Sequence, residues 1–274
     1  MTAEKKLYWK NTNGVTLASF GHCIFISLTS MALPMFFTDV VYLSPASVSL
    51  IFLITRVWDA VNDPIMGSIV DRTRTKWGKC RPYLLYSSFP LLLFTILMFS
   101  SFNFQSQTAK FAYALITYVL FITSFTMVDI PLAGLKPLLY TEPEQRNKAL
   151  SFSSTFGSLG SLLAIDLFFI FVELFGGGSN RRGFFITALI LAFLAFASLQ
   201  GGFFTTKEVV PVSNKKTSFV KTMMTVLKNK HLILLIIVQI CSIGISAYST
   251  DLRVSFRAFQ SILNILWTEE IRLC

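Results

Sequence analysis

Charged side chains are scarce in this chain, and their scarcity excludes most soluble folds. Only 14% of the 274 residues are charged, whereas 53% are hydrophobic and the mean hydropathy is +0.62. A soluble domain carries about a quarter charged residues. The two histidines and four cysteines show no catalytic pairing, disulfide framework or metal-ligand spacing. The composition therefore indicates an integral membrane protein and argues against an intramembrane hydrolase.

Seven apolar runs are long enough to cross a bilayer, which takes about 20 helical residues. They predict spans at residues 17–40, 46–69, 83–102, 111–134, 149–175, 184–204 and 231–250. The domains expected from these spans are a six-helix transmembrane bundle (1–206), a basic linker (207–230), a seventh helix (231–250) and a divergent tail (251–274). The first run is too long for a cleaved signal peptide and lacks a small-residue cleavage site.

Basic residues are distributed unequally between the two sets of loops. Seventeen Lys and Arg residues lie before the first span and in the loops after the second, fourth and sixth, whereas Lys110, Arg181 and Arg182 lie on the other side. The positive-inside rule therefore places the N-terminus in the cytoplasm. This pattern also explains the net charge of +10, so no nucleic-acid partner is expected.

Small and special residues inside the spans predict how the helices pack. Prolines within four spans permit kinks around a cavity: these are Pro34, Pro64, Pro90 and Pro131. The fifth span has a run of small residues suited to close helix packing: Gly157, Ser158, Gly160 and Ser161. Its two later acids, Asp166 and Glu173, are expected at solvated positions.

Three carboxylates lie inside predicted spans, where each costs roughly 2.5 to 3.5 kcal/mol near a helix centre. Asp59 and Asp63 share one helical face with Arg56, and Asn62 lies beside them. Asp129 lies in the fourth span. Two such carboxylates either share a proton or hold a cation between them. Hard oxygen ligands favour Na⁺, Li⁺ or H⁺ over a soft transition metal.

Other interpretations of these residues remain open at this point. The charges could form an ion-pair network that locks helices together, although the acids outnumber Arg56. His22 is a lone imidazole in the first span, for which a packed or interfacial position is expected. A channel would need a continuous polar stripe, and little of one is present outside the second and fourth spans.

One long motif resembles a known family. The stretch from Arg56 to Gly67 (RVWDAVNDPIMG) continues through Asp71-Arg72 to Gly78-Lys-Cys-Arg81-Pro82, and Met127-Val-Asp129-Ile-Pro131 follows in the fourth span. This combination resembles the glycoside–pentoside–hexuronide:cation symporters, the melibiose-permease-like branch of the major facilitator superfamily. The resemblance covers residues 14 to about 250. It implies an all-α integral membrane fold, multi-pass in the plasma (bacterial inner) membrane, with no cofactor.

The resemblance also assigns roles to individual residues. A coupling-cation site is implied at Asp59, Asn62, Asp63, Thr126 and Asp129, with Asp129 bridging to the sugar. A cytoplasmic loop that latches two halves of the protein is implied between the second and third spans, with Gly67, Asp71, Arg72, Gly78, Lys79 and Arg81. Positions that contact sugar in melibiose-type members correspond to Cys23, Phe125, Ala133 and Ser154.

At the sugar positions the sequence departs from the melibiose-type pattern. Cys23 replaces an Asp, Ser154 an Arg, Ala133 a Trp and Phe125 a Tyr. Loss of groups that make bidentate bonds to hydroxyls weakens galactoside binding, so either the substrate differs or transport has decayed. The expected function is cation-coupled symport of a glycoside, pentoside or hexuronide.

The length of the chain leaves alternatives to that function open. The family has twelve helices, and the chain is expected to hold the first six and part of a seventh. A truncated, non-transporting remnant is therefore the alternative, and a homodimer of two halves is a further possibility.

Overall fold

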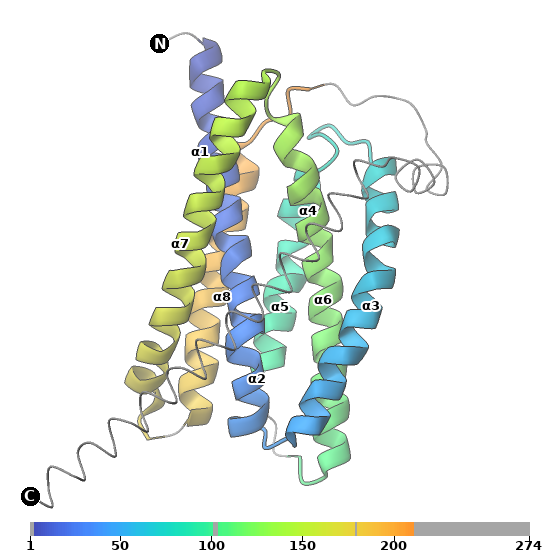
Figure 1. Cartoon of the computed structure of the whole chain (residues 1–274), viewed down its shortest axis with the longest axis vertical. Coiled ribbons are helices and arrows are strands. Elements are labelled where there is room, and N and C mark those ends of the chain that lie inside the picture. Colours follow the sequence, from blue (N-terminus) through green and yellow to red (C-terminus); the bar gives the residue numbers. More distant parts are fainter. Residues whose placement is uncertain (1–2, 101–103, 179, 211–274) are drawn as a thin grey trace, which may run out of the picture. The chain divides into compact units, whose positions relative to one another are not determined.

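The computed structural model describes residues 3–100, 104–178 and 180–210 (Figure 1). They belong to one compact unit, residues 1–213. This part of the chain is α-helical, and an isolated bridge between Thr75 and Gly78 is the β-type pairing found in it. The predicted seventh helix, the tail and all but the first residues of the predicted linker lie outside the described residues.

Six helical rods follow one another along the described part of the chain. The first is continuous through α1 (Ala3–Ser27), the π-helical turn η1 (Leu28–Ala32), α2 (Leu33–Met35) and a second π-helical turn η2 (Phe36–Val40). The second is α3 (Pro45–Arg72), and the third comprises α4 (Arg81–Tyr86) and α5 (Ser88–Phe99). The others are α6 (Gln107–Leu138), α7 (Pro143–Gly176) and α8 (Asn180–Thr205). The rods coincide with the six segments predicted before residue 206 to be helical, and the first helix begins earlier than predicted.

Local sequence signals explain where several of these helices begin, end or change geometry. The Ser44 hydroxyl accepts a hydrogen bond from the Ser47 N–H, and Pro45 is the first residue of α3. The break between α4 and α5 at Ser87 comes just before Pro90, which has no N–H to donate to the preceding turn. Gly177 ends α7 in the left-handed conformation, with φ of 51°.

The helices meet the length and apolarity that a membrane demands, with one informative exception. Five rods are long and apolar enough to cross a bilayer: Glu4–Val40, Arg81–Phe99, Gln107–Leu138, Pro143–Gly176 and Asn180–Thr205. At 28 residues α3 is also long enough, but it carries Arg56, Asp59 and Asp63. The fold is that of an integral, multi-pass membrane protein in which α3 carries three charged residues in its middle turns.

Close helix contacts hold α1 against both α7 and α8 (Figure 1). A Cβ at Gly160 of α7 would lie 2.9 Å from the Phe20 carbonyl oxygen of α1, and one at Gly21 would lie 2.5 Å from the Ala195 carbonyl oxygen of α8. Gly157 and Gly160 are buried, as the small-residue face predicted, but Ser158 is exposed and does not belong to that face. Glycine therefore sets the spacing on both sides of α1.

Candidate functional site

The acidic face of α3 lies against α6, which is its main neighbour (Figure 1). The Thr126 hydroxyl of α6 donates to Asp59 Oδ1 over 3.3 Å. Arg56 Nη1 lies 3.8 Å from Asp59 Oδ2, but the Arg56 side chain is 74% exposed, so this ion pair is weak. Trp58 Nε1 donates to Thr123 Oγ1 over 2.9 Å and sets the register of the two helices. Asp59 thus accepts one long hydrogen bond, from Thr126, and is weakly paired with one guanidinium group, that of Arg56.

Next to Asp59 lies a buried amide that the bundle leaves unsatisfied. Asn62 is buried, and its Nδ2 has no hydrogen-bond partner among the described residues. Leaving such a group unpaired costs about 1 to 3 kcal/mol. Asp63 is exposed and lies within electrostatic range of both Asp59 and Asp129. Polar groups on α3 therefore outnumber their partners.

Asp129 is paired across the bundle with His22 of α1. His22 Nε2 lies 2.9 Å from Asp129 Oδ1, and the two side chains are 13% and 49% exposed. The imidazole also stacks on Phe125, with ring centroids 4.9 Å apart and planes 18° apart. The expectation of a packed histidine is therefore confirmed. Its contact with Asp129 was not anticipated, because no sequence spacing relates residues on two different helices.

The other residues predicted on the sugar side are either half-buried or exposed. Cys23 is half-buried and lies beside Gly157, where a Cβ would come within 3.1 Å of its Sγ. Phe125 is half-buried under His22. Ala133 and Ser154 are exposed on α6 and α7. The structure therefore brings His22, Phe125 and Asp129 together in one cluster, and Cys23 adjoins His22 in the chain.

The carboxylates do not form a tight metal cage. Among residues 3–100, 104–178 and 180–210, no group of three or more His, Cys, Asp or Glu side chains is placed to hold a metal ion. Asp59 is bound to Thr126, and Asp129 to His22. A monovalent cation also accepts hydroxyl and amide oxygens, so Thr126 and Asn62 are suitable additional ligands.

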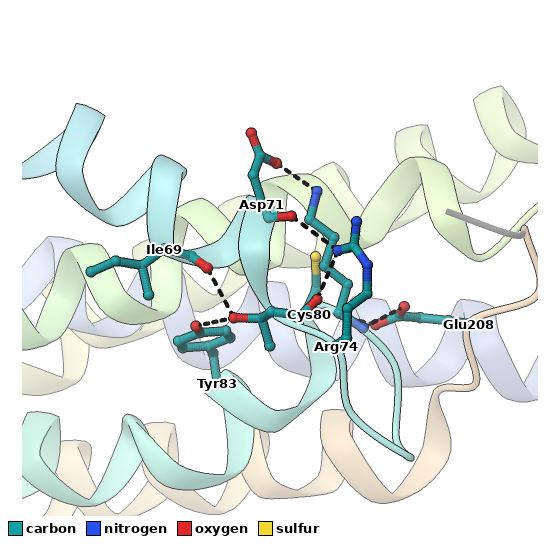
Figure 2. A network of polar contacts seen from close by, with 8 residues as sticks. Ile69, Asp71, Arg74, Cys80, Tyr83 and Glu208 are labelled. Carbon is teal, nitrogen blue, oxygen red and sulfur yellow. Dashed lines mark hydrogen bonds and ion pairs between the residues drawn. The ribbon is translucent and has the colours of Figure 1, made fainter. Parts of the chain in front are cut away.

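The loop between α3 and α4 is held by many polar contacts (Figure 2). Lys79 Nζ lies 2.6 Å from Asp71 Oδ1. Arg74 Nη1 donates to the carbonyl oxygens of Asp71 and Thr73 over 2.9 and 2.8 Å. The hydroxyls of Thr73 and Tyr83 are 2.6 Å apart. Two basic side chains of the loop therefore bind Asp71, Lys79 through its carboxylate and Arg74 through its carbonyl oxygen.

The other residues predicted for this loop differ in how many contacts they make with the rest of the bundle. Arg81 Nη2 donates to the Phe203 carbonyl oxygen of α8 over 2.8 Å, and its guanidinium lies 4.9 Å from the Phe203 ring centre. Arg72 is exposed, and a Cβ at Gly67 would meet open space. Glu208, which sequence reasoning assigned to the linker, also binds this loop. Nothing in the sequence around Glu208 indicated that it contacts this loop.

These features define a polytopic helical membrane protein with polar groups clustered at mid-helix on α1, α3 and α6. The chain belongs to the family described as MFS/sugar transport protein, which it matches over residues 14–249. This is a family of transporters rather than enzymes, and it confirms the resemblance to glycoside–pentoside–hexuronide symporters.

Several curated relatives are similar to this chain. The Isoprimeverose transporter of Lactiplantibacillus pentosus is 34% identical over 223 residues, covering 80% of this chain and 46% of that protein. The Inner membrane symporter YicJ of Escherichia coli (strain K12) is 36% identical over 183 residues, covering 67% and 40%. The Glucuronide carrier protein homolog of the same organism is 30% identical over 143 residues, covering 52% and 31%. The chain spans less than half the length of these three relatives.

Proposed function

We propose that this bundle contributes the cation-binding half of a sugar symporter, which moves a glycoside, pentoside or hexuronide with Na⁺, Li⁺ or H⁺. The observation that supports this most is the mid-helix contact of Asp59 with Thr126, with Asp63 within electrostatic range of both Asp59 and Asp129. Carboxylates in a membrane bundle are costly and typically mark an ion pathway. A bound monovalent cation offsets that cost.

Cation and sugar are coupled in this proposal through shared charge. Asp63 lies within electrostatic range of both Asp59 and Asp129, so a cation bound near Asp59 and Asp63 lowers the negative potential at Asp129. Asp129 is half-exposed although His22 Nε2 lies 2.9 Å from its Oδ1, so a sugar hydroxyl that donates to this carboxylate shares it with His22. By linkage, the sugar then raises the cation affinity by the same factor. Alternating access around a midplane site converts this coupling into symport.

The sugar side of the site, in our proposal, uses Asp129 with the rings of His22 and Phe125 in place of charged groups from α1 and α7. Cys23, Ala133 and Ser154 are small and uncharged, so they leave room and supply few strong hydrogen bonds. We expect a substrate recognised by one carboxylate and a stacking surface. Two relatives are named for isoprimeverose and glucuronide, and these are the first glycosides to test.

We also propose a plasma-membrane location with the N-terminus in the cytoplasm, from the distribution of basic residues. The loop between α3 and α4 then lies on the cytoplasmic side, as do the loop between α6 and α7 and the residues after α8. A cysteine-scanning assay with a membrane-impermeant reagent tests this orientation. Labelling at residue 76 from the outside would reverse it.

The test of symport is uptake of labelled glycosides by proteoliposomes under an imposed Na⁺ or H⁺ gradient. Gradient-driven uptake that disappears in Asp59→Ala is the expected result. Uptake that survives Asp59→Ala contradicts the proposed cation site. Cation binding without uptake by this chain identifies a half-bundle that binds but does not transport, which is the alternative open from the sequence.

A further inference from the structure

The residues that follow α8 are bonded back to other parts of the bundle. The Lys207 N–H donates to Asn11 Oδ1 of α1 over 2.7 Å, and Asn11 Nδ2 donates to the Lys207 carbonyl oxygen over 3.1 Å. The N–H groups of Val209 and Val210 both donate to the Leu138 carbonyl oxygen of α6, over 2.9 and 3.1 Å. Glu208 lies between these anchors, so its backbone is fixed on both sides.

The Glu208 carboxylate accepts hydrogen bonds from three consecutive backbone N–H groups of the loop between α3 and α4. Oε2 accepts from Lys79 over 2.9 Å, and Oε1 accepts from Cys80 over 2.8 Å and from Arg81 over 3.2 Å. Figure 2 shows Glu208 reaching this loop from the segment after α8. Hydrogen bonds from amide N–H groups to a carboxylate are among the strong ones in proteins.

Gly78 is shaped for the same carboxylate. Its φ of +110° lies in a region that residues with a side chain rarely adopt. A Cβ at Gly78 would overlap the Glu208 carboxylate carbon. Glycine is therefore required here twice, for the turn and for the close approach of Glu208.

Two further contacts tie the loop to the end of α8. Arg81 donates to the Phe203 carbonyl oxygen, which lies in the last turn of α8, where carbonyls lack helical partners. The Trp77 ring packs edge-on against the Phe203 ring, with centroids 5.8 Å apart. Glu208 and Arg81 thus hold the loop to α8 and its following residues from two directions.

We propose that Glu208 is the positioning residue that fastens the loop of residues 71–81 to its own six-helix bundle. The loop then moves with the bundle as one body and presents the exposed side chains of Arg72, Arg74 and Lys76 at fixed positions. Its part in the transport cycle rests on the proposed function, whereas the fastening itself does not.

The alkylation rate of Cys80 measures whether the loop stays fastened to the bundle. Its side chain is buried, and burial raises the pKa of its thiol to about 12. Little thiolate therefore forms at neutral pH, and alkylation is slow. Cys23, half-buried on α1, serves as an internal reference, because it reacts faster only when the bundle itself opens. Alkylation of the two peptides by N-ethylmaleimide is measured by mass spectrometry on the full chain in lipid nanodiscs.

Glu208→Gln is expected to speed the alkylation of Cys80 by about tenfold or more, because release of the loop restores water and loss of the Glu208 charge also favours thiolate, while Cys23 is unchanged. Gly78→Ala is expected to act in the same way without changing charge, and Glu208→Asp to restore part of the protection. Glu142→Gln removes an exposed acid near the same ends of the helices and should change neither rate. An unchanged Cys80 rate in Glu208→Gln overturns the proposal. So does equal acceleration of Cys80 and Cys23, which assigns Glu208 to general stability. No transport is needed, so failure here is separate from failure of the proposed function.

Discussion

The middle and the C-terminal end of α3 hold a carboxylate in different ways. At its last turn, Asp71 lies 2.6 Å from Lys79, in a loop that Glu208 and Arg81 also hold. At mid-helix, Asp59 lies 3.8 Å from Arg56 and accepts a 3.3 Å bond from Thr126. The first carboxylate is satisfied by the chain itself. The second is not.

The difference distinguishes two roles for a carboxylate. Asp71 helps to fix the conformation of the loop, whereas Asp59 remains available to a ligand. Close, well-directed partners in the loop fix a conformation and leave little for a ligand to gain. At mid-helix the partners are weaker: the Thr126 bond to Asp59 is 3.3 Å long, Arg56 is 74% exposed, and the neighbouring Asn62 Nδ2 has no partner among the described residues. In the proposed function, a cation bound between Asp59 and Asp63 offsets the cost of these two carboxylates, whereas the Asn62 Nδ2 is a donor and needs an acceptor instead.

Replacement of Asp129 should produce the largest change in sugar affinity. Asp129→Asn removes the negative charge that His22 and the sugar share, so sugar affinity should fall about 10- to 100-fold, as expected for a lost hydrogen bond to a charged group. Isothermal titration with a glycoside measures this. Asp166→Asn, at an exposed acid on α7, is the matched control. Equal affinities for the two variants would remove Asp129 from the site.

Loss of Arg81 should produce the largest change in stability on the loop side. Arg81→Gln removes the bond to the Phe203 carbonyl and the contact with its ring, and should lower the free energy of unfolding by about 1.5 to 3 kcal/mol. Denaturation in detergent measures it. Cation affinity should be unchanged, and Arg72→Gln at an exposed position should have no effect. If Arg81→Gln lowered the cation affinity as much as substitution of Asp59 or Asp63, the loop and the mid-helix carboxylates would not have separate roles.

Asn62 should show opposite effects on stability and binding. Asn62→Leu replaces a buried amide whose Nδ2 has no acceptor in the described residues, and should raise the free energy of unfolding by about 1 kcal/mol. Cation affinity should fall at the same time, because an oxygen ligand is lost. Thermal unfolding with and without Na⁺ measures both effects. A destabilised variant would show that the Asn62 side chain serves the fold.

The smallest effect is expected at the start of α7. Lys148 Nζ lies 2.7 Å from Glu144 Oε1, but both side chains are largely exposed, at 70% and 80%. Solvent screens such pairs strongly. Lys148→Gln should therefore leave the thermal unfolding midpoint unchanged within error. A shift as large as that of Arg81→Gln would show that a short distance alone stabilises this bundle.

Periodicity and apolar length were enough to predict the six described helices, and the small residues of α7 predicted a close helix contact but not that its partner is α1. Contacts between distant segments could not be predicted in the same way. His22 and Asp129 lie on different helices, and Glu208 lies in a stretch whose composition reads as a linker. Gly21, which sets the spacing of α1 and α8, has no sequence partner that marks it. Those pairings depend on tertiary geometry, which a single sequence does not encode as a pattern.

Binding of radioactive sodium to the purified chain tests the central claim most directly, with three single substitutions on the same helix. Asp59→Asn and Asp63→Asn should abolish saturable binding, whereas Asp71→Asn should retain it. Equal loss in all three variants, or retained binding in Asp59→Asn, would contradict the assignment of the mid-helix carboxylates to a cation.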